Sequence, residues 1–224
     1  MSVADVCAVA VSCVQGTGAW VTAASGQGPD FVIFVSDPIS EQLAELQVTL
    51  GEGPGHDVLT SAAPVLGEDI EDEEAGRRWP AFTAEAGKLG ARAVFAFPLA
   101  IGAIRTGAMG LYRNWPGPLT RAQLGDSLLL SDAATALLLA GVHSDGDTDG
   151  PLWQGQAPDL AVHRAEVDQA TGMLSVQLAV SAGEAYARLR AYAYAQDRRL
   201  GDVARDIVAR RLRLHPDPAQ DDTG

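Results

Sequence analysis

The sequence predicts an α+β fold, in which an antiparallel sheet of about five or six strands with flanking helices is followed by a C-terminal three-helix bundle. Three observations lead to this prediction. Strand-like and helix-like hydrophobic patterns alternate over residues 1–141. Residues 142–158 are dense in Gly, Asp and Pro and lack periodicity, which is typical of a linker. Residues 159–215 then show helical patterns alone, and the acidic residues 216–224 are typical of a disordered tail.

Turn and cap signals define the first elements of the N-terminal part. Residues 2–13 have a helical pattern, and the β-rich runs AWVTAAS and DFVIFVS, separated by GQGP, predict a hairpin. The stretch DPISEQLAELQVTLG predicts a helix with Pro38 in its first turn and Gly51 as its end. The stretch GEGPGHDVLTSAAPVL predicts a Gly-rich loop, a short helix and a short strand, and a helical segment follows around Pro80.

The remaining strands and one long helix complete this part. The stretch ARAVFAFPLAIGAIRTGAMGLYRNW predicts two or three strands, at Ala93–Pro98, around Ile101 and at Gly107–Tyr112. Thr120 and the glutamine three residues later form a capping-box pattern that opens an apolar helix ending at Gly141. We expect the helices to lie mainly on one side of the sheet.

Three amphipathic helices are expected in the C-terminal part. Asp159 can cap a helix that ends near Leu178, and Ser181 opens a second helix through a capping box with Glu184. Gly201 is the expected N-cap of the third helix, which presents Arg205, Arg210 and Arg213 outward. Apolar positions three or four residues apart on the first helix predict a short coiled-coil seam and hence self-association: Leu160, His163, Val167, Ala170 and Leu174.

The charge of the chain is unevenly distributed. The 224 residues carry a formal net charge of −13, which argues against non-specific binding of nucleic acid by the whole chain. Residues 1–158 hold seven basic against nineteen acidic residues, whereas residues 159–215 hold nine arginines against seven acids. An arginine-rich end of this kind is compatible with a specific nucleic-acid contact.

Several classes of protein are disfavoured by what the sequence lacks. No basic, apolar leader and no long uncharged apolar run is present, so we expect a cytoplasmic protein without a membrane contact. Cys7 and Cys13, the only cysteines, lie six apart on a predicted helix and read as two buried thiols rather than a redox pair. Neither a catalytic motif nor a cluster of metal ligands is visible, so we expect no catalytic residues, no metal and no enzyme.

The N-terminal part resembles a GAF domain over residues 3–141. The resemblance rests on LGEGPGHDVLTSAAPVLGEDI followed by AVFAFPLAIGAIRTGAMGLY. It implies a sensory module that binds a small molecule beside its sheet or serves as a dimerisation platform. No residue identifies a ligand or a cofactor. The chain also lacks the acidic pair and the aspartate of a phosphoacceptor domain, which favours ligand or redox sensing over phosphorylation.

The stretch QATGMLSVQLAVSAGEAYARLRAYAYAQDRRLGDVA resembles the ANTAR domain, the RNA-binding module of bacterial antiterminators. The resemblance covers residues 160–214 and implies a dimer that binds paired hairpins with short loops in a nascent leader transcript, which prevents a terminator from forming. Many members carry lysine where this chain has Thr171. The implied RNA-binding residues combine small residues that let RNA approach, this threonine, and cations for phosphates: Ala170, Thr171, Gly172, Arg188, Arg190, Arg198, Arg199 and Arg205.

Two functions remain open at this point. The first is an RNA-binding antitermination regulator controlled by its GAF domain. The second is a sensory or scaffold protein whose helical C-terminal module binds a protein partner or DNA. The expected homodimer could form through residues 2–13 with 120–140, through residues 159–178, or through both.

Overall fold

The chain is divided into two compact units. The structure, a computed structural model, describes residues 1–24, 30–102, 104–142 and 158–215. The division falls between Met1–Ala161 and Val162–Gly224, which we call the N-terminal unit and the C-terminal unit. The predicted GQGP turn, the predicted tail and the interior of the predicted linker lie outside the described residues.

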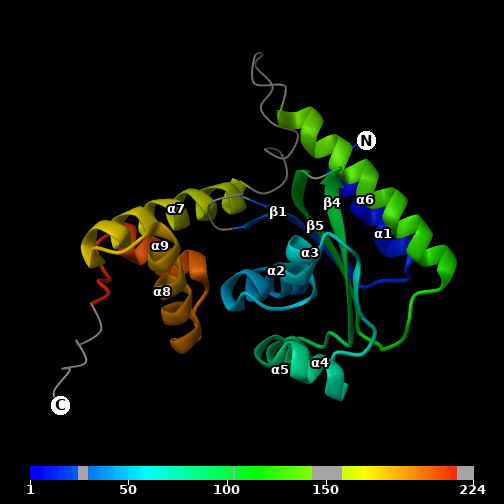
Figure 1. The fold of residues 1–224 in the computed structure, drawn as a ribbon, viewed down its shortest axis with the longest axis horizontal. Coiled ribbons are helices and arrows are strands. Elements are labelled where there is room, and N and C mark those ends of the chain that lie inside the picture. The colour runs from blue at the N-terminus through cyan, green and yellow to red at the C-terminus, as the bar shows by residue number, and fades with distance from the viewer. Residues whose placement is uncertain (25–29, 103, 143–157, 216–224) are drawn as a thin grey trace. The chain divides into compact units, whose positions relative to one another are not determined.

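A five-stranded antiparallel sheet is the centre of the N-terminal unit (Figure 1). The strands pair in the order β2-β1-β5-β4-β3. Their bounds are β1 Gly18–Ala23, β2 Phe31–Val35, β3 Val65–Gly67, β4 Ala93–Ile101 and β5 Ile104–Arg113. The predicted β1–β2 hairpin is confirmed. The stretch from Ala93 onward forms two strands, because Ile101 pairs with Ile104 at the end of the β4–β5 hairpin and forms no strand of its own.

Within the described residues of this unit, six helices cover the sheet on both of its faces (Figure 1). Their bounds are α1 Val3–Cys13, α2 Pro38–Leu50, α3 Pro54–Ser61, α4 Glu73–Arg78, α5 Pro80–Lys88 and α6 Arg121–Val142. Phe95 and Phe97 of β4 pack in a core with α1 and α6, whereas Val94 and Ala96 pack in a second core with α2 to α5. The expectation of helices mainly on one side is therefore wrong. The apolar run AVFAFPL does not alternate with polar residues, because both of its faces are buried.

Local cap signals fix the starts of α2 and α6. Asp37 caps α2: its Oδ1 accepts the backbone N–H groups of Ile39 and Ser40, each at 2.9 Å. Burial opposes ionisation of Asp37, but hydrogen bonds from Ser36 and Ser40 outweigh it, so its pKa is lowered. The capping box that opens α6 is also present, and Gly51 ends α2 in the left-handed conformation.

Two buried tryptophans occupy the core on the α2–α5 face. Trp20 of β1 lies over Gly110 of β5, where an added Cβ would come within 2.1 Å of the indole ring. Gly110 is thus required by close packing rather than by its backbone angles. Trp79 separates α4 from α5, and its indole Nε1 donates to Asp57 Oδ2 at 3.0 Å.

Arg113 is a buried cation of the N-terminal unit. Its Nε donates to the Val14 carbonyl at 2.8 Å, and Nη1 donates to the carbonyls of Gly117 and Pro118 at 3.4 and 3.5 Å. The guanidinium also lies 5.2 Å from the centre of the Phe95 ring. Burial lowers the pKa of Arg113. This side chain joins the end of α1, the end of β5 and the loop before α6 through its hydrogen bonds to these carbonyl groups.

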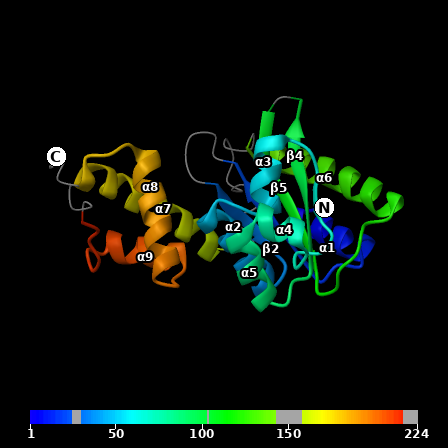
Figure 2. The same ribbon diagram turned by 60° about the horizontal axis from the view of Figure 1, so that its bottom comes forward.

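The C-terminal unit is a three-helix bundle (Figure 2). Its helices are α7 Pro158–Leu178, α8 Ala182–Ala195 and α9 Leu200–Val208. The core is made of small and aliphatic side chains from all three helices: Val167, Ala170, Leu174, Leu178, Ala185, Leu189, Ala193, Leu200, Val203, Ala204 and Ile207. Tyr186, Tyr192 and Tyr194 lie on α8 outside this core, and Tyr194 is 52% exposed.

Two details of this unit differ from the sequence prediction. Arg199, not Gly201, is the N-cap of α9, because Leu200 is part of the core and already belongs to the helix. The coiled-coil seam is wrong for the positions that are described: Val167, Ala170 and Leu174 are buried within the chain itself and are not available to a partner. The side chains of Leu160 and His163 lie outside the described residues.

The two thiols are expected to differ in reactivity. Cys7 is fully buried, which raises its pKa to about 12, so it stays protonated at about pH 8. Cys13 is partly exposed at the end of α1. Dithionitrobenzoate should therefore modify one thiol in the native chain and two in denaturant, and Cys13→Ser should remove the native reaction. Rapid modification of both thiols under native conditions would contradict the buried position of Cys7.

Candidate nucleic-acid interface

At least four arginines of the C-terminal unit face carboxylates of the same unit. Arg188 pairs with Glu184 one helical turn earlier on α8, at 2.9 Å. The ion pairs of Arg198 and Arg211 converge on Asp206, at 2.7 and 2.8 Å. Their hydrogen bonds lower the pKa of Asp206. These pairs neutralise much of the positive charge that the composition of residues 159–215 suggests.

Arg205 connects two helices of the bundle. Its Nε lies 3.1 Å from Glu166 Oε1 on α7, and its Nη1 lies 3.1 Å from Asp202 Oδ1 on its own helix. The hydrogen bond to Glu166 raises the pKa of Arg205. Arg198 also contacts Asp202, through the backbone carbonyl at 3.4 Å. The structure therefore brings Arg198 and Arg205 to the same aspartate.

Arg190 and Arg199 complete the arginines that were predicted to bind RNA. The guanidinium of Arg190 lies 5.7 Å from the centre of the Tyr186 ring, one turn earlier on α8. This cation–π contact orients the side chain along the helix. Arg199 is exposed at the start of α9.

The three small residues predicted on α7 lie in different environments. Ala170 is fully buried and Thr171 is buried, with the Thr171 hydroxyl donating to the Val167 carbonyl at 2.8 Å. In this position that hydroxyl bonds its own helix rather than a ligand. Gly172 is exposed, and an added Cβ would meet no atom within 4 Å. Of the three, Gly172 alone presents open space on the outer face of α7.

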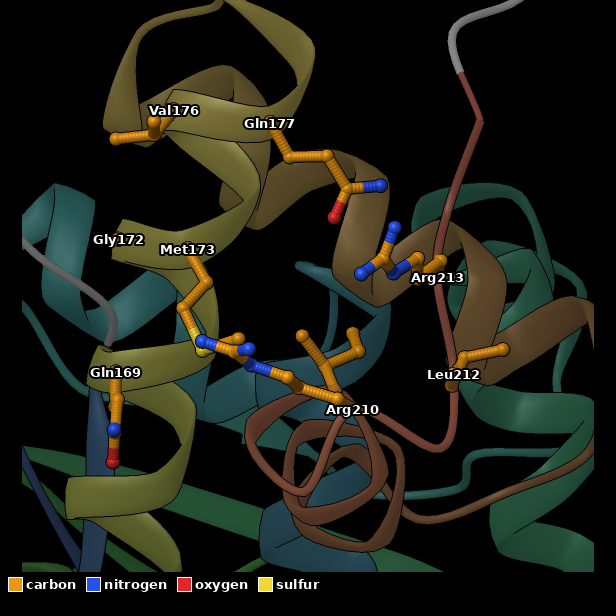
Figure 3. Close-up of a pocket in the computed structure, with 9 residues that line it drawn as sticks. Gln169, Gly172, Met173, Val176, Gln177, Arg210, Leu212 and Arg213 are labelled. Carbon is orange, nitrogen blue, oxygen red and sulfur yellow. The ribbon is translucent and has the colours of Figure 1, made fainter.

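An open groove of about 700 Å³ lies beside Gly172 (Figure 3). We call it the α7 groove. One wall comes from the outer face of α7, and the other comes from the end of α9 and the residues after it. Its lining residues are Gln169, Gly172, Met173, Val176, Gln177, Ile207, Arg210, Leu212 and Arg213.

The segment after α9 turns sharply to form its wall of the groove. Arg210 has a left-handed backbone, with φ of 59°. The next two backbone N–H groups, of Arg211 and Leu212, both donate to the Asp206 carbonyl, at 2.8 and 3.1 Å. Gln177 of α7 donates its side-chain amide to the Leu214 carbonyl, which holds this segment against α7. A left-handed non-glycine residue gives no sequence signal, so the groove could not be foreseen.

Arg210 and Arg213 differ from the other arginines of the unit. Both are exposed and line the α7 groove, and neither forms an ion pair with any residue that the structure describes. Arg210 extends toward α7, on the side where Met173 also points, and Arg213 lies nearer Gln177 (Figure 3). The sequence predicted that both face outward and offered Arg210 as a weaker candidate for RNA binding beside Arg188 and Arg205, but it did not include Arg213. The groove brings together Gly172 and two cations, whereas no described contact adds Arg188, Arg190, Arg198, Arg199 or Arg205 to it.

Other kinds of site find no support in the described part of the chain. Within it, no group of three or more His, Cys, Asp or Glu side chains is placed to hold a metal ion. None of the helices described is both long enough and apolar enough to span a bilayer.

Comparison with known proteins gives a family match for the C-terminal unit and similar folds for the N-terminal unit. Residues 160–208 match the family model of the ANTAR domain. The GAF3 domain of a Synechocystis protein, in its photoproduct state, is 13% identical with a TM-score of 0.50, and the match covers 65% of this chain and 97% of that one. The GAF domain of a phosphoenolpyruvate-protein phosphotransferase from Coxiella burnetii is 15% identical with a TM-score of 0.50, covering 63% and 82%. A search of curated proteins finds no significant match.

Proposed function

We propose that this chain, which combines a unit of GAF fold with an ANTAR domain, is an RNA-binding regulator of transcription antitermination. The match of residues 160–208 to the ANTAR family is the observation that carries the proposal. In this function the chain binds paired hairpins in a nascent leader transcript, which keeps a terminator hairpin from forming, so that transcription continues.

Each part of the chain has a role in this proposal. Residues 1–141 are the sensory domain and take a small-molecule ligand. Residues 142–158 connect it to the RNA-binding domain at residues 159–215, and the chain acts as a homodimer in the cytoplasm. Since Val167, Ala170 and Leu174, the described positions of the predicted seam on α7, are buried within one chain, helices of the N-terminal unit are the better candidates for the dimer contact. Val9 of α1 and Leu129 of α6 are exposed apolar residues on those helices.

The predicted arginines can serve RNA despite their ion pairs. Exposed pairs such as Arg188 with Glu184 contribute only about 0–1 kcal/mol to stability, so a phosphate can replace the carboxylate at low cost. Tyr194 is exposed and can stack on an unpaired base. Ala170 and Thr171 are buried, so their side chains do not project from α7 beside Gly172. We assign them the role of leaving room there for the RNA to approach the helix.

The decisive experiment is an equilibrium titration of the full chain at fixed salt. The probe is a pool of RNAs with two short hairpins and randomised loops, enriched by rounds of selection on the immobilised chain. We expect the selected RNA to bind tightly and a loop-scrambled version to lose that affinity, because loop bases carry the sequence information. Equal binding to scrambled RNA, or to duplex DNA, would contradict the proposal. It would indicate either contacts to the nucleic-acid backbone alone or a function in binding a protein partner.

A substitution separates a role in binding from a role in folding. Arg190→Ala should weaken binding of the selected RNA about tenfold, because it removes a charge-assisted contact, while the helical circular-dichroism signal stays unchanged. A loss of helicity would show instead that Arg190 and its contact with Tyr186 stabilise α8.

A further inference from the structure

We infer that the α7 groove binds one unstacked loop nucleotide of the RNA. The base of this nucleotide packs on Met173 and Val176, and its phosphate lies between Arg210 and Arg213. This inference rests on the proposed function and locates the binding site within it. It moves the centre of the interface away from the paired arginines of α8 and α9. The sequence offered Arg210 only as a weaker candidate for RNA binding, and it did not indicate Arg213 at all.

The charge of the groove favours an anionic occupant. Arg198, Arg205 and Arg211 already face carboxylates at 2.7 to 3.1 Å, so each gives a neutralised surface. Arg210 and Arg213 have no carboxylate partner among the described residues, although they lie on the same segment of chain. Two guanidinium groups on one rim match the geometry of a phosphate diester.

The α7 wall of the groove favours a flat, largely apolar group. Val176 is 84% exposed, and it lies one helical turn beyond Gly172 and next to Met173 in the groove. A thioether and an exposed aliphatic side chain are favourable surfaces for the face of an aromatic ring. Gln169 and Gln177 line the same groove with carboxamides, which offer both a donor and an acceptor to the edge of a base.

The shape of the groove favours a nucleotide that is part of a longer chain. Its volume of about 700 Å³ lies within the range of about 300–1,000 Å³ that is typical of sites for small organic groups. The groove is open to solvent, so the nucleotide bound in it can remain joined to the rest of an RNA chain outside. The missing side chain at Gly172 leaves the α7 surface low where the backbone of the RNA would pass.

The first test removes the two cations. The double variant Arg210→Gln/Arg213→Gln should bind the selected two-hairpin RNA about a hundredfold more weakly, roughly tenfold for each lost charge-assisted contact. The slope of log Kd against log salt should fall by about 0.7 for each phosphate contact that is lost. The matched control Arg77→Gln/Arg121→Gln removes the same charge from exposed positions of the N-terminal unit and should change neither quantity.

A second test addresses the surface without touching charge. Gly172→Ala should weaken binding about tenfold because the new methyl group stands where the RNA approaches, and the helix itself should not lose stability. Gly183→Ala is the matched control, since its Cβ also meets no atom within 4 Å and it lies in α8 of the same unit. An abasic scan of the loops should find one nucleotide whose loss weakens binding to the natural chain but not to Val176→Glu, as expected for a direct contact.

The outcomes distinguish a failure of the groove assignment from a failure of the proposed function. If the natural chain binds no RNA, the proposed function fails and the groove has no ligand of this kind. If it binds with loop dependence but the double variant and Gly172→Ala bind as well as their controls, the function stands and the groove assignment is overturned. If the same variants change the mass of the chain in light scattering and leave RNA affinity unchanged, the groove is a contact between two copies, which also overturns the assignment.

Discussion

Replacing Arg113 with methionine is expected to lower the free energy of unfolding of the N-terminal unit by about 1–3 kcal/mol. The substitution removes the donors that the carbonyls of Val14, Gly117 and Pro118 use, and water cannot replace the donor at the buried Val14 carbonyl. A buried acceptor left without a donor costs about 1–3 kcal/mol. Equilibrium unfolding in urea measures the change. A loss of this size is a large part of the total stability of an ordinary domain.

Two control variants make the result specific. Arg77→Met changes an exposed arginine of α4 and should alter stability by less than about 0.5 kcal/mol. Arg113→Lys keeps the charge but not the fork of donors, so an intermediate loss is expected. If Arg113→Met and Arg77→Met were equally stable, the carbonyl contacts of Arg113 would contribute nothing, and the junction of α1, β5 and α6 would have to be held by apolar packing alone.

Leu189→Ala is expected to unfold the C-terminal unit while the N-terminal unit keeps its structure. Leu189 is fully buried at the centre of α8, and leucine-to-alanine changes in cores cost about 2–5 kcal/mol. So small a bundle has little stability to lose. Hydrogen–deuterium exchange read by mass spectrometry should show lost protection in peptides from α7 to α9 and unchanged protection in the sheet. Loss of RNA binding should accompany it.

The control for this prediction comes from the same bundle. Val176→Ala shortens an apolar side chain on α7 that is 84% exposed, and it should leave amide protection in all three helices unchanged. If Leu189→Ala also removed protection from β4 and β5, the two units would not be independent in stability, contrary to the division of the chain into two compact units.

Local signals made most of the secondary structure predictable. The caps at Asp37, Thr120 and Ser181 are hydrogen bonds between neighbours in sequence, so the sequence carries all the information needed to place them. The two family resemblances depend on longer patterns and are also confirmed, by the ANTAR match and by the GAF fold of solved structures. The predicted RNA-binding residues remain a prediction, because nothing described here includes RNA.

The parts that sequence did not predict depend on packing between distant elements. Helices cover both faces of the sheet because α2 to α5 return to the face opposite α1 and α6, which no local period encodes. The apolar stripe of α7 is buried by α8 and α9 of the same chain, and a stripe alone cannot distinguish that from a coiled coil. The α7 groove depends on a left-handed turn at Arg210. Such turns are predicted from glycine or asparagine, and neither residue stands at this position.

The division of aromatic residues between the two units gives the protein a pair of built-in labels. All four tryptophans precede residue 162, whereas three of the four tyrosines lie on α8 of the C-terminal unit. Indole emission, with Trp20 and Trp79 shielded from water, therefore reports on the N-terminal unit. Chemical modification of tyrosine reports mainly on the helical bundle. A ligand of the first unit can be followed by its effect on indole emission, without an attached dye.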